Sequence, residues 1–167
     1  MIFLAKVINT LSNLLRSIAL LTMAFMMFFI TAAVFSRLLF TPIIGDVEVI
    51  QLGMVVLIMC GLAYTHQVNG HISIEFIVKK FPNKAQYLIN ILAQLLTLIA
   101  TLVVTFIYIE VAFNHKNHMH LSTGLLEIPY YPFDFIIVLG FLMWGLEALL
   151  KLIYSIMELF TSKTIDG

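Results

Sequence analysis

Histidine is the residue type in this sequence whose spacing most suggests chemistry. His115, His118 and His120 form an H-x-x-H-x-H pattern. Imidazole nitrogens bind transition metals, but the neighbouring Lys116 and Asn117 supply neither a carboxylate nor a thiolate that would complete a site. We therefore expect an exposed polar loop here, and no metal centre.

A haem is the second chemistry that the histidines suggest. A b-type haem in a helical bundle needs two histidines at the same depth, on facing helices. His66 and His71 precede the apolar segment that the histidine cluster follows, so a membrane-spanning helix would separate the two groups.

The single cysteine, Cys60, allows no intrachain disulfide. No Ser-His-Asp pattern, glycine-rich phosphate loop or paired carboxylates stand in the sequence. We expect a non-enzyme without a cofactor.

The segments that carry these residues have the composition of membrane spans. Hydrophobic residues make up 62% of the chain and charged residues 11%, and the mean hydropathy is +1.06. Soluble domains are about half apolar and about a quarter charged. Three runs are free of charge, Ser17 to Ser36, Val49 to Thr65 and Ala85 to Ile109, and each approaches or exceeds the length that crosses a hydrocarbon core of about 30 Å.

A fourth apolar segment, Phe135 to Leu146, is shorter and is followed by Glu147 and Lys151. These two residues are four apart on one helix face and could pair where the helix leaves the bilayer. The sequence thus predicts an all-α integral membrane protein with short amphipathic interfacial helices. It forms a single membrane domain over residues 1–167, with four transmembrane helices at about 14–37, 47–66, 86–113 and 131–157.

The charges predict an orientation. Every Lys and Arg except Arg37 and Lys116 falls in the N-terminal segment, in the connection after the second span, or near the C-terminus. By the positive-inside rule, both termini are cytoplasmic. Nine basic residues balance nine acidic ones, so nothing suggests nucleic acid. The first apolar run is longer than a signal-peptide core and no small-x-small site follows it, so we expect it to be retained.

Two further segments are amphipathic. Apolar residues recur at helical spacing in residues 4–18, opposite a polar face, which predicts a helix on the cytoplasmic surface or one leading into the first span. In residues 71–81, His71 and Glu75 are one turn apart and could pair, and Pro82 ends the segment. We favour membrane anchoring over a dedicated partner site for both.

A polar stripe runs along the third span. Asn90, Gln94, Thr97, Thr101 and Thr105 recur every three or four residues and so share one helix face. In lipid such a stripe should face protein, where hydrogen bonds between helices contribute about 0.6 to 2 kcal/mol each. The alternative is a polar permeation path, but the first three spans hold no acid, base or proline at mid-depth. We favour a structural role.

Several short motifs occur in a characteristic order. They are Gly45-Asp46-Val47-Glu48, then Gly70-His71-Ile72-Ser73-Ile74-Glu75 before Lys79, Lys80 and Pro82, then Ser122-Thr123-Gly124, then Ile128-Pro129-Tyr130-Tyr131-Pro132, and Gly140 within the fourth span. On four spans with both termini inside, this order resembles the small membrane subunit of tripartite ATP-independent periplasmic (TRAP) transporters. The resemblance covers nearly the whole chain.

The resemblance implies a scaffold role. In that family a large permease subunit carries the sodium-coupled substrate site, a periplasmic binding protein delivers an organic acid of the C4-dicarboxylate or sialic acid type, and the small subunit packs against the large one. The implied partners are those two proteins and membrane lipid, in the bacterial inner membrane. We expect no catalytic or substrate-binding residue here. The expected partner-interface residues are Arg37, Asp46, Glu48, His71, Glu75, Asn90, Gln94, Thr97 and Thr101.

Within this set we expect an ion pair that fixes how the first two spans meet. Arg37 ends the first span and Glu48 begins the second, so we predict that they pair, partly buried against the large subunit, with Asp46 as the alternative acid. Two other functions remain open: a haem-binding membrane anchor of a respiratory enzyme, and an autonomous small channel or exporter.

Overall fold

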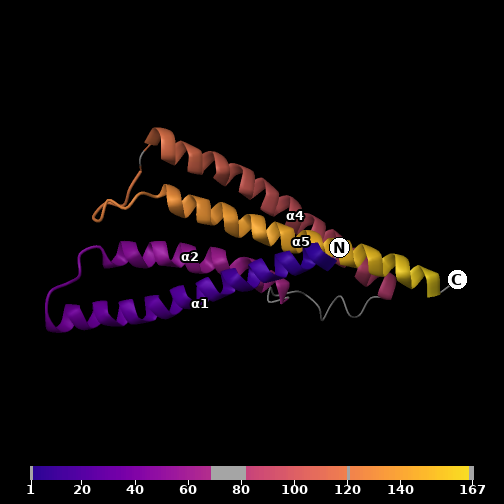
Figure 1. Ribbon diagram of the computed structural model, residues 1–167, viewed down its shortest axis with the longest axis horizontal. Coiled ribbons are helices and arrows are strands. Elements are labelled where there is room, and N and C mark those ends of the chain that lie inside the picture. Colours follow the sequence, from indigo (N-terminus) through magenta and orange to yellow (C-terminus); the bar gives the residue numbers. More distant parts are fainter. Residues whose placement is uncertain (1, 69–81, 120, 166–167) are drawn as a thin grey trace.

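The computed structural model describes residues 2–68, 82–119 and 121–165, and in these residues the chain is almost entirely helical (Figure 1). The helices are α1 (Ile2–Leu39), α2 (Asp46–Gln67), α4 (Asn83–Asn114) and α5 (Tyr131–Ile165), and a π-helical turn, η1 (His115–Met119), continues α4. All four long helices are long and apolar enough to cross a membrane. The predicted all-α membrane fold with four spans is confirmed.

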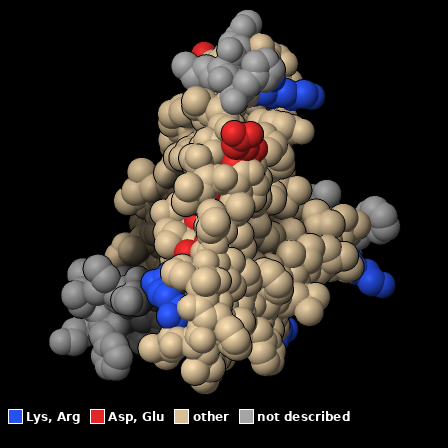
Figure 2. Space-filling model, turned by 90° about the vertical axis from the view of Figure 1, so that its left-hand side faces the viewer, with Lys and Arg blue, Asp and Glu red and all other residues tan. Residues whose placement is uncertain are grey.

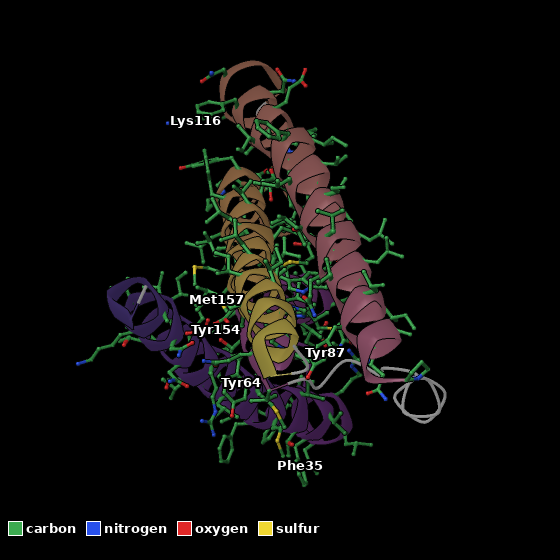
Figure 3. The ribbon with its side chains drawn as sticks, turned by 90° about the vertical axis from the view of Figure 1, so that its right-hand side faces the viewer. Phe35, Tyr64, Tyr87, Lys116, Tyr154 and Met157 are labelled. Atoms are coloured by element: carbon green, nitrogen blue, oxygen red, sulfur yellow. The ribbon has the colours of Figure 1, made fainter. Side chains whose placement is uncertain are left out.

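The helices form two antiparallel hairpins, α1–α2 and α4–α5 (Figure 1). We call the end with the 40–45 and 121–130 connections the loop end, and the opposite end, where α1 begins, the terminal end. The outer helices, α1 and α4, diverge toward the loop end (Figure 1). Phe35 of α1 and Lys116 after α4 accordingly lie on opposite sides of the molecule in the view along its long axis (Figure 3).

The fourth span, the weakest in the sequence, is the centre of the structure. α5 packs mainly against α4 and α2 and also touches α1. Its hydropathy is diluted by Glu147 and Lys151, and both lie on the side of α5 that other helices cover. The polar residues that weaken the hydropathy signal are therefore those that join α5 to its neighbours.

Glycines allow the helices to approach α5 closely. A Cβ added at Gly140 would lie 2.7 Å from the backbone oxygen of Met59 in α2. At Gly145 it would lie 3.0 Å from the hydroxyl oxygen of Thr101 in α4. Small residues at such crossings let backbones come together in lipid, where packing and hydrogen bonds replace the hydrophobic effect.

The core is small and lies near the terminal end. It consists of buried side chains from α1, α2 and α5, namely Ile8, Leu15, Cys60, Ala63, Met143 and Leu150. Many large apolar side chains elsewhere are exposed, for example Leu21 at 72% and Phe28 at 78%. At the loop end, too, most of the surface is uncharged, with acidic and basic side chains in a few separate places (Figure 2). Such a surface is suited to lipid or to other apolar helices.

The N-terminal amphipathic segment is the beginning of α1, which runs without interruption from residue 2 to residue 39. Of the two predicted arrangements, the helix that leads into the first span is the one observed. The other amphipathic segment, residues 71–81 with His71 and Glu75, lies outside the described residues.

Candidate partner interface

The turn between α1 and α2 is fixed by an ion pair. The Arg37 guanidinium donates to Oδ2 of Asp46, whose Oδ1 accepts the Val47 backbone N–H at 2.8 Å. Gly45 precedes Asp46 with φ 79°, a left-handed conformation that favours glycine. Asp46 is 7% exposed, whereas the Arg37 side chain is 57% exposed. Arg37 thus pairs with a buried carboxylate while more than half of its own side chain stays exposed.

Glu48 has a different role from the predicted one. Its carboxylate oxygens accept the backbone N–H groups of Leu125 at 2.8 Å and Leu126 at 3.0 Å. The pairing of Arg37 with Glu48 is therefore replaced by the alternative that the sequence allowed, Arg37 with Asp46. Glu48 instead ties the start of α2 to the connection between α4 and α5.

The 121–130 connection is ordered by its own hydrogen bonds. Thr123 donates its backbone N–H to the Ile128 carbonyl at 2.9 Å, and its hydroxyl oxygen accepts the Ile128 N–H at 3.0 Å. Between them Glu127 adopts a positive φ of 53°. The Leu126 side chain covers Gly45, so this connection packs on the α1–α2 turn. These contacts join the two hairpins at the loop end.

The two histidines whose side chains the structure describes lie in separate places. Nδ1 of His115 lies 2.7 Å from Oδ2 of Asp134, which links the end of α4 to the start of α5. Nε2 of His66 lies 3.0 Å from Oε1 of Gln94, at the terminal end. Among the described residues no three metal-binding side chains come together. The side chains of His118 and His120 are outside the description.

A polar network joins all four helices near the terminal end. The Ser12 hydroxyl of α1 donates to Oε1 of Glu147 in α5 at 2.6 Å, and both residues are buried, at 0% and 2% exposure. The Lys151 ammonium donates to the backbone carbonyl of His66 in α2, and the His66 ring contacts Gln94 of α4. The two residues that were expected to pair on α5 thus each bond to another helix.

Sequence reasoning missed Ser12. The polar positions around it were assigned to the exposed face of the N-terminal helix, whereas Ser12 lies between the buried Ile8 and Leu15. A single hydroxyl on an otherwise apolar face was the available signal, since a buried polar group needs a partner. The partner lies 135 residues away and was not evident from spacing.

The polar stripe of the third span is divided between two environments. Thr101 and Thr105 are buried at 1% and 6% exposure, and their hydroxyls donate to carbonyls of their own helix. Thr97 is partly exposed and likewise bonds its own helix, while Asn90 is exposed. Gln94 contributes a contact between helices, with His66. The stripe therefore provides mainly close packing against α5, because the threonine hydroxyls donate their hydrogen bonds to carbonyls of α4 itself.

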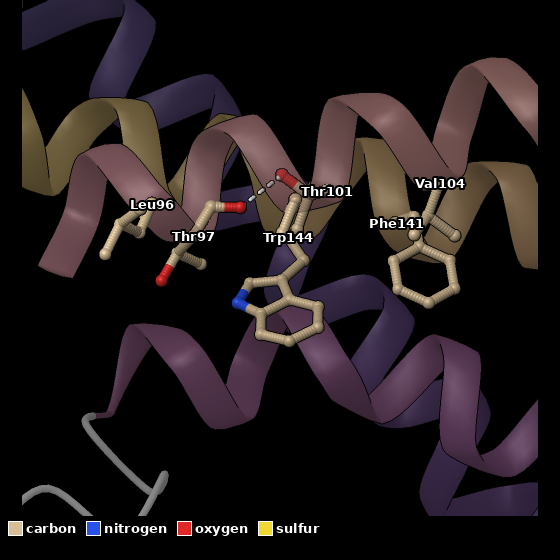
Figure 4. A pocket seen from close by; sticks show the side chains of 7 residues that line it. Leu96, Thr97, Thr101, Val104, Phe141 and Trp144 are labelled. Carbon is tan, nitrogen blue, oxygen red and sulfur yellow. Dashed lines mark hydrogen bonds between the residues drawn. The ribbon is translucent and has the colours of Figure 1, made fainter.

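A groove lies beside the buried part of this stripe (Figure 4). It has a volume of about 300 Å³ and lies between α4 and α5. Its lining is almost wholly apolar and comprises Leu96, Thr97, Ala100, Thr101, Val104, Phe141 and Trp144. Such a groove is suited to an apolar side chain or an acyl chain, and it offers no charged group to an ionic solute.

Comparison with known families decides what kind of protein this is. Residues 26–158 match the model of the DctQ component of tripartite ATP-independent periplasmic transporters. The chain belongs to the DctQ family. It is thus a small membrane component of a TRAP transporter, as its motifs indicated. No curated protein matches the chain.

The DctQ match extends from Met26, in the second half of α1, to Glu158 in α5. It includes the Arg37–Asp46 pair, Glu48 and the polar network around Glu147. It does not include Ser12 or the rest of the first 25 residues. The N-terminal part of α1 is therefore a feature of this chain on which the family match is silent.

Proposed function

We propose that this DctQ component is a non-catalytic scaffold subunit, which packs against the large permease subunit of a transporter for sodium-coupled uptake of an organic acid. The observation that carries the proposal is that its buried and partly buried polar groups bond to other helices of the same chain. In the described part of the chain, Glu147, His66 and Gln94 bond to side chains of other helices, and Lys151 to a backbone carbonyl of α2. Groups engaged in this way hold helices together, whereas a permeation path requires groups that receive a solute.

The expected contact with the large subunit has two parts. One is the loop-end cluster of Arg37, Asp46 and Glu48, in which the Arg37 side chain is more than half exposed. The other is the stripe on α4. Asn90 of this stripe is exposed, Gln94 and Thr97 are partly exposed, and Thr101 is buried. A polar amide on a lipid-facing helix is costly unless another protein covers it. His71 and Glu75 remain expected contacts in the segment outside the description.

We further propose that the protein lies in the bacterial inner membrane with both termini in the cytoplasm. Lys6 and Arg16 lie in the first half of α1, and Lys151 contacts the last turn of α2, so all three are toward the terminal end. This supports the orientation by the positive-inside rule. Cysteines placed singly at Phe3, Met119 and Ile165, in a Cys60→Ala background, test it. Positions 3 and 165 should react with an impermeant maleimide only from the cytoplasmic side, and position 119 only from outside. An outward-facing terminus contradicts the four-span orientation.

The transport role is tested by uptake in proteoliposomes. The substrate class, a C4-dicarboxylate or a sialic acid type solute, follows from the family resemblance alone. Liposomes that hold the large permease and this chain, supplied with the binding protein, should take up solute under an inward sodium gradient. Liposomes that lack this chain should show little uptake. Solute movement by this chain alone would contradict the scaffold role and favour an autonomous channel.

A further inference from the structure

α4 presents two kinds of surface outside its contact with α5. We call the first the large row, because it consists of large apolar side chains that repeat every three or four residues and are all exposed, namely Leu88, Leu92, Leu95, Ile99, Leu102 and Phe106. The second, the small row, has the same spacing but consists of residues that are polar or smaller than leucine, namely Asn90, Ala93, Thr97, Ala100 and Val104. Residues with this spacing share one side of a helix, so the two rows lie on different faces of α4.

The small row is a surface within the membrane. Asn90, Ala93 and Ala100 are exposed, and the whole row lies in the charge-free run 85–109. From Asn90 to Val104 it extends about 21 Å along α4, most of the about 30 Å of a hydrocarbon core. Small side chains let the backbone of another helix approach closely, and an exposed amide in lipid is costly unless a protein group bonds to it. The large row is therefore suited to lipid and the small row to a second helix.

The apolar groove between α4 and α5 lies beside the small row and is an independent observation. Thr97, Ala100 and Val104 lie on its α4 side, and Phe141 and Trp144 on its α5 side (Figure 4). The groove of about 300 Å³ has room for side chains that a helix on the small row would project toward α5.

Aromatic contacts hold the α5 side of the groove in place. The Phe141 ring stacks with that of Trp144 at a centroid distance of 6.0 Å and with that of Tyr108 at 6.5 Å. The Trp144 ring also lies 6.2 Å from the ring of His66 in α2. Rings that contact one another in this way keep their positions, so the groove is formed in this chain by itself. A partner that enters it does not have to open it, which lowers the cost of binding.

We propose that the small row and the groove receive a membrane-spanning helix of the large permease subunit. The backbone of that helix lies along Ala93 and Ala100, a bulky apolar side chain enters the groove against Phe141 and Trp144, and a polar group bonds the Asn90 amide. The proposal rests on the scaffold role proposed above and assigns to it a face and a kind of contact. An acyl chain is the weaker occupant, because it has no hydrogen-bonding group for Asn90 and does not require small residues at positions 93 and 100.

Two neighbouring substitutions give the first test. Ala100→Trp places an indole in the small row, and Ile99→Trp places the same side chain at nearly the same depth in the large row. Each affinity-tagged variant is isolated from its native membranes in mild detergent, and the permease that accompanies it is quantified by mass spectrometry. We expect Ala100→Trp to lower the permease yield about fivefold or more, the effect of overpacking a close contact, and Ile99→Trp to leave it near the wild-type value. Equal yields from the two variants overturn the proposal.

Photocrosslinking is the second test and leaves the small residues unchanged, so it does not depend on how the tryptophan variants fold. The photoreactive residue p-benzoylphenylalanine replaces Leu96, which lines the groove, or Leu95, which belongs to the large row at nearly the same depth. After irradiation of native membranes, position 96 should form an adduct with the large permease and position 95 should not. An adduct at position 96 with lipid alone, or with a second copy of this chain, identifies a different occupant and overturns the proposal.

The wild-type chain separates failure of this proposal from failure of the scaffold role. If the tagged wild-type chain retains the permease but position 96 does not crosslink to it, the scaffold role stands and the proposed face is wrong. If the wild-type chain retains no permease, the scaffold role fails and the proposed contact fails with it.

Discussion

The close approach of α5 to α2 at Gly140 allows a single substitution to test how these helices pack. An alanine Cβ at this position would lie 2.7 Å from the backbone oxygen of Met59, 2.8 Å from its Cβ and 3.0 Å from its Cα. Two of these three atoms are backbone, so a change of side-chain rotamer in Met59 does not remove the contact. The helices must move apart.

The size of the effect follows from two opposing contributions. Overpacking in a well-packed site costs about 1–3 kcal/mol. Alanine in place of glycine inside a helix gains about 0.8–1 kcal/mol. Gly61→Ala in α2 has the same gain, and a Cβ there meets no atom within 4 Å. The difference in unfolding free energy between Gly140→Ala and Gly61→Ala should therefore be the overpacking cost, about 1–3 kcal/mol.

The assay is reversible unfolding in mixed micelles as the fraction of denaturing detergent rises, with helix content followed by circular dichroism. Gly140→Ala should unfold at a lower fraction than Gly61→Ala, and Gly61→Ala at or above the wild-type value. If the two variants unfold at the same point, α5 and α2 do not approach as closely as described, and the account of α5 as the central helix fails.

Three further predictions concern the polar links. Ser12→Ala removes a hydrogen bond to the buried carboxylate of Glu147 and should lower the unfolding free energy by about 1.5–3 kcal/mol in the same assay. The loss should be smaller in a Glu147→Gln background, and equal losses in both backgrounds would show that the two residues are not coupled. Arg37→Ala should lower the unfolding free energy by about 1–2 kcal/mol, a loss between those of exposed and buried ion pairs. In the double variant with Asp46→Asn the further loss should be small, and a loss equal to the sum of the two single variants would argue against the pair. Glu48→Ala should speed hydrogen exchange of the backbone amides in the 121–130 connection, and unchanged exchange there would contradict its role as their acceptor.

Hydrophobic runs predicted the existence of four spans, but not where the helices end. Charge ends an apolar run, but it does not end a helix, because backbone hydrogen bonds continue through lysine, arginine and glutamate. α1 accordingly begins well before Arg16, as the amphipathic pattern of residues 4–18 indicated, and α5 continues past Glu147 and Lys151 to Ile165. The same two residues made the fourth span look weak, since a hydropathy sum does not register that a polar side chain has a partner on another helix.

Spacing brought the loop-end residues together but did not assign their partners. Arg37 was within reach of both Asp46 and Glu48, and the choice depends on the positive φ of Gly45 and on a connection almost 80 residues further along the chain. That connection presents two backbone N–H groups to Glu48. Local sequence contains no information on such a contact, whereas the resemblance to the family had drawn attention to the 122–124 and 128–132 motifs of this connection.

Co-purification tests the central claim, that this DctQ chain is a scaffold for a larger permease, most directly. An affinity-tagged copy should be expressed at native level and isolated from membranes in mild detergent. Quantitative mass spectrometry should then find a large multi-span permease at about one copy per copy of this chain, and the yield of that permease should fall when Asn90 and Gln94 are both replaced by leucine. Recovery of the tagged chain as a stable species with no large membrane partner would contradict the account.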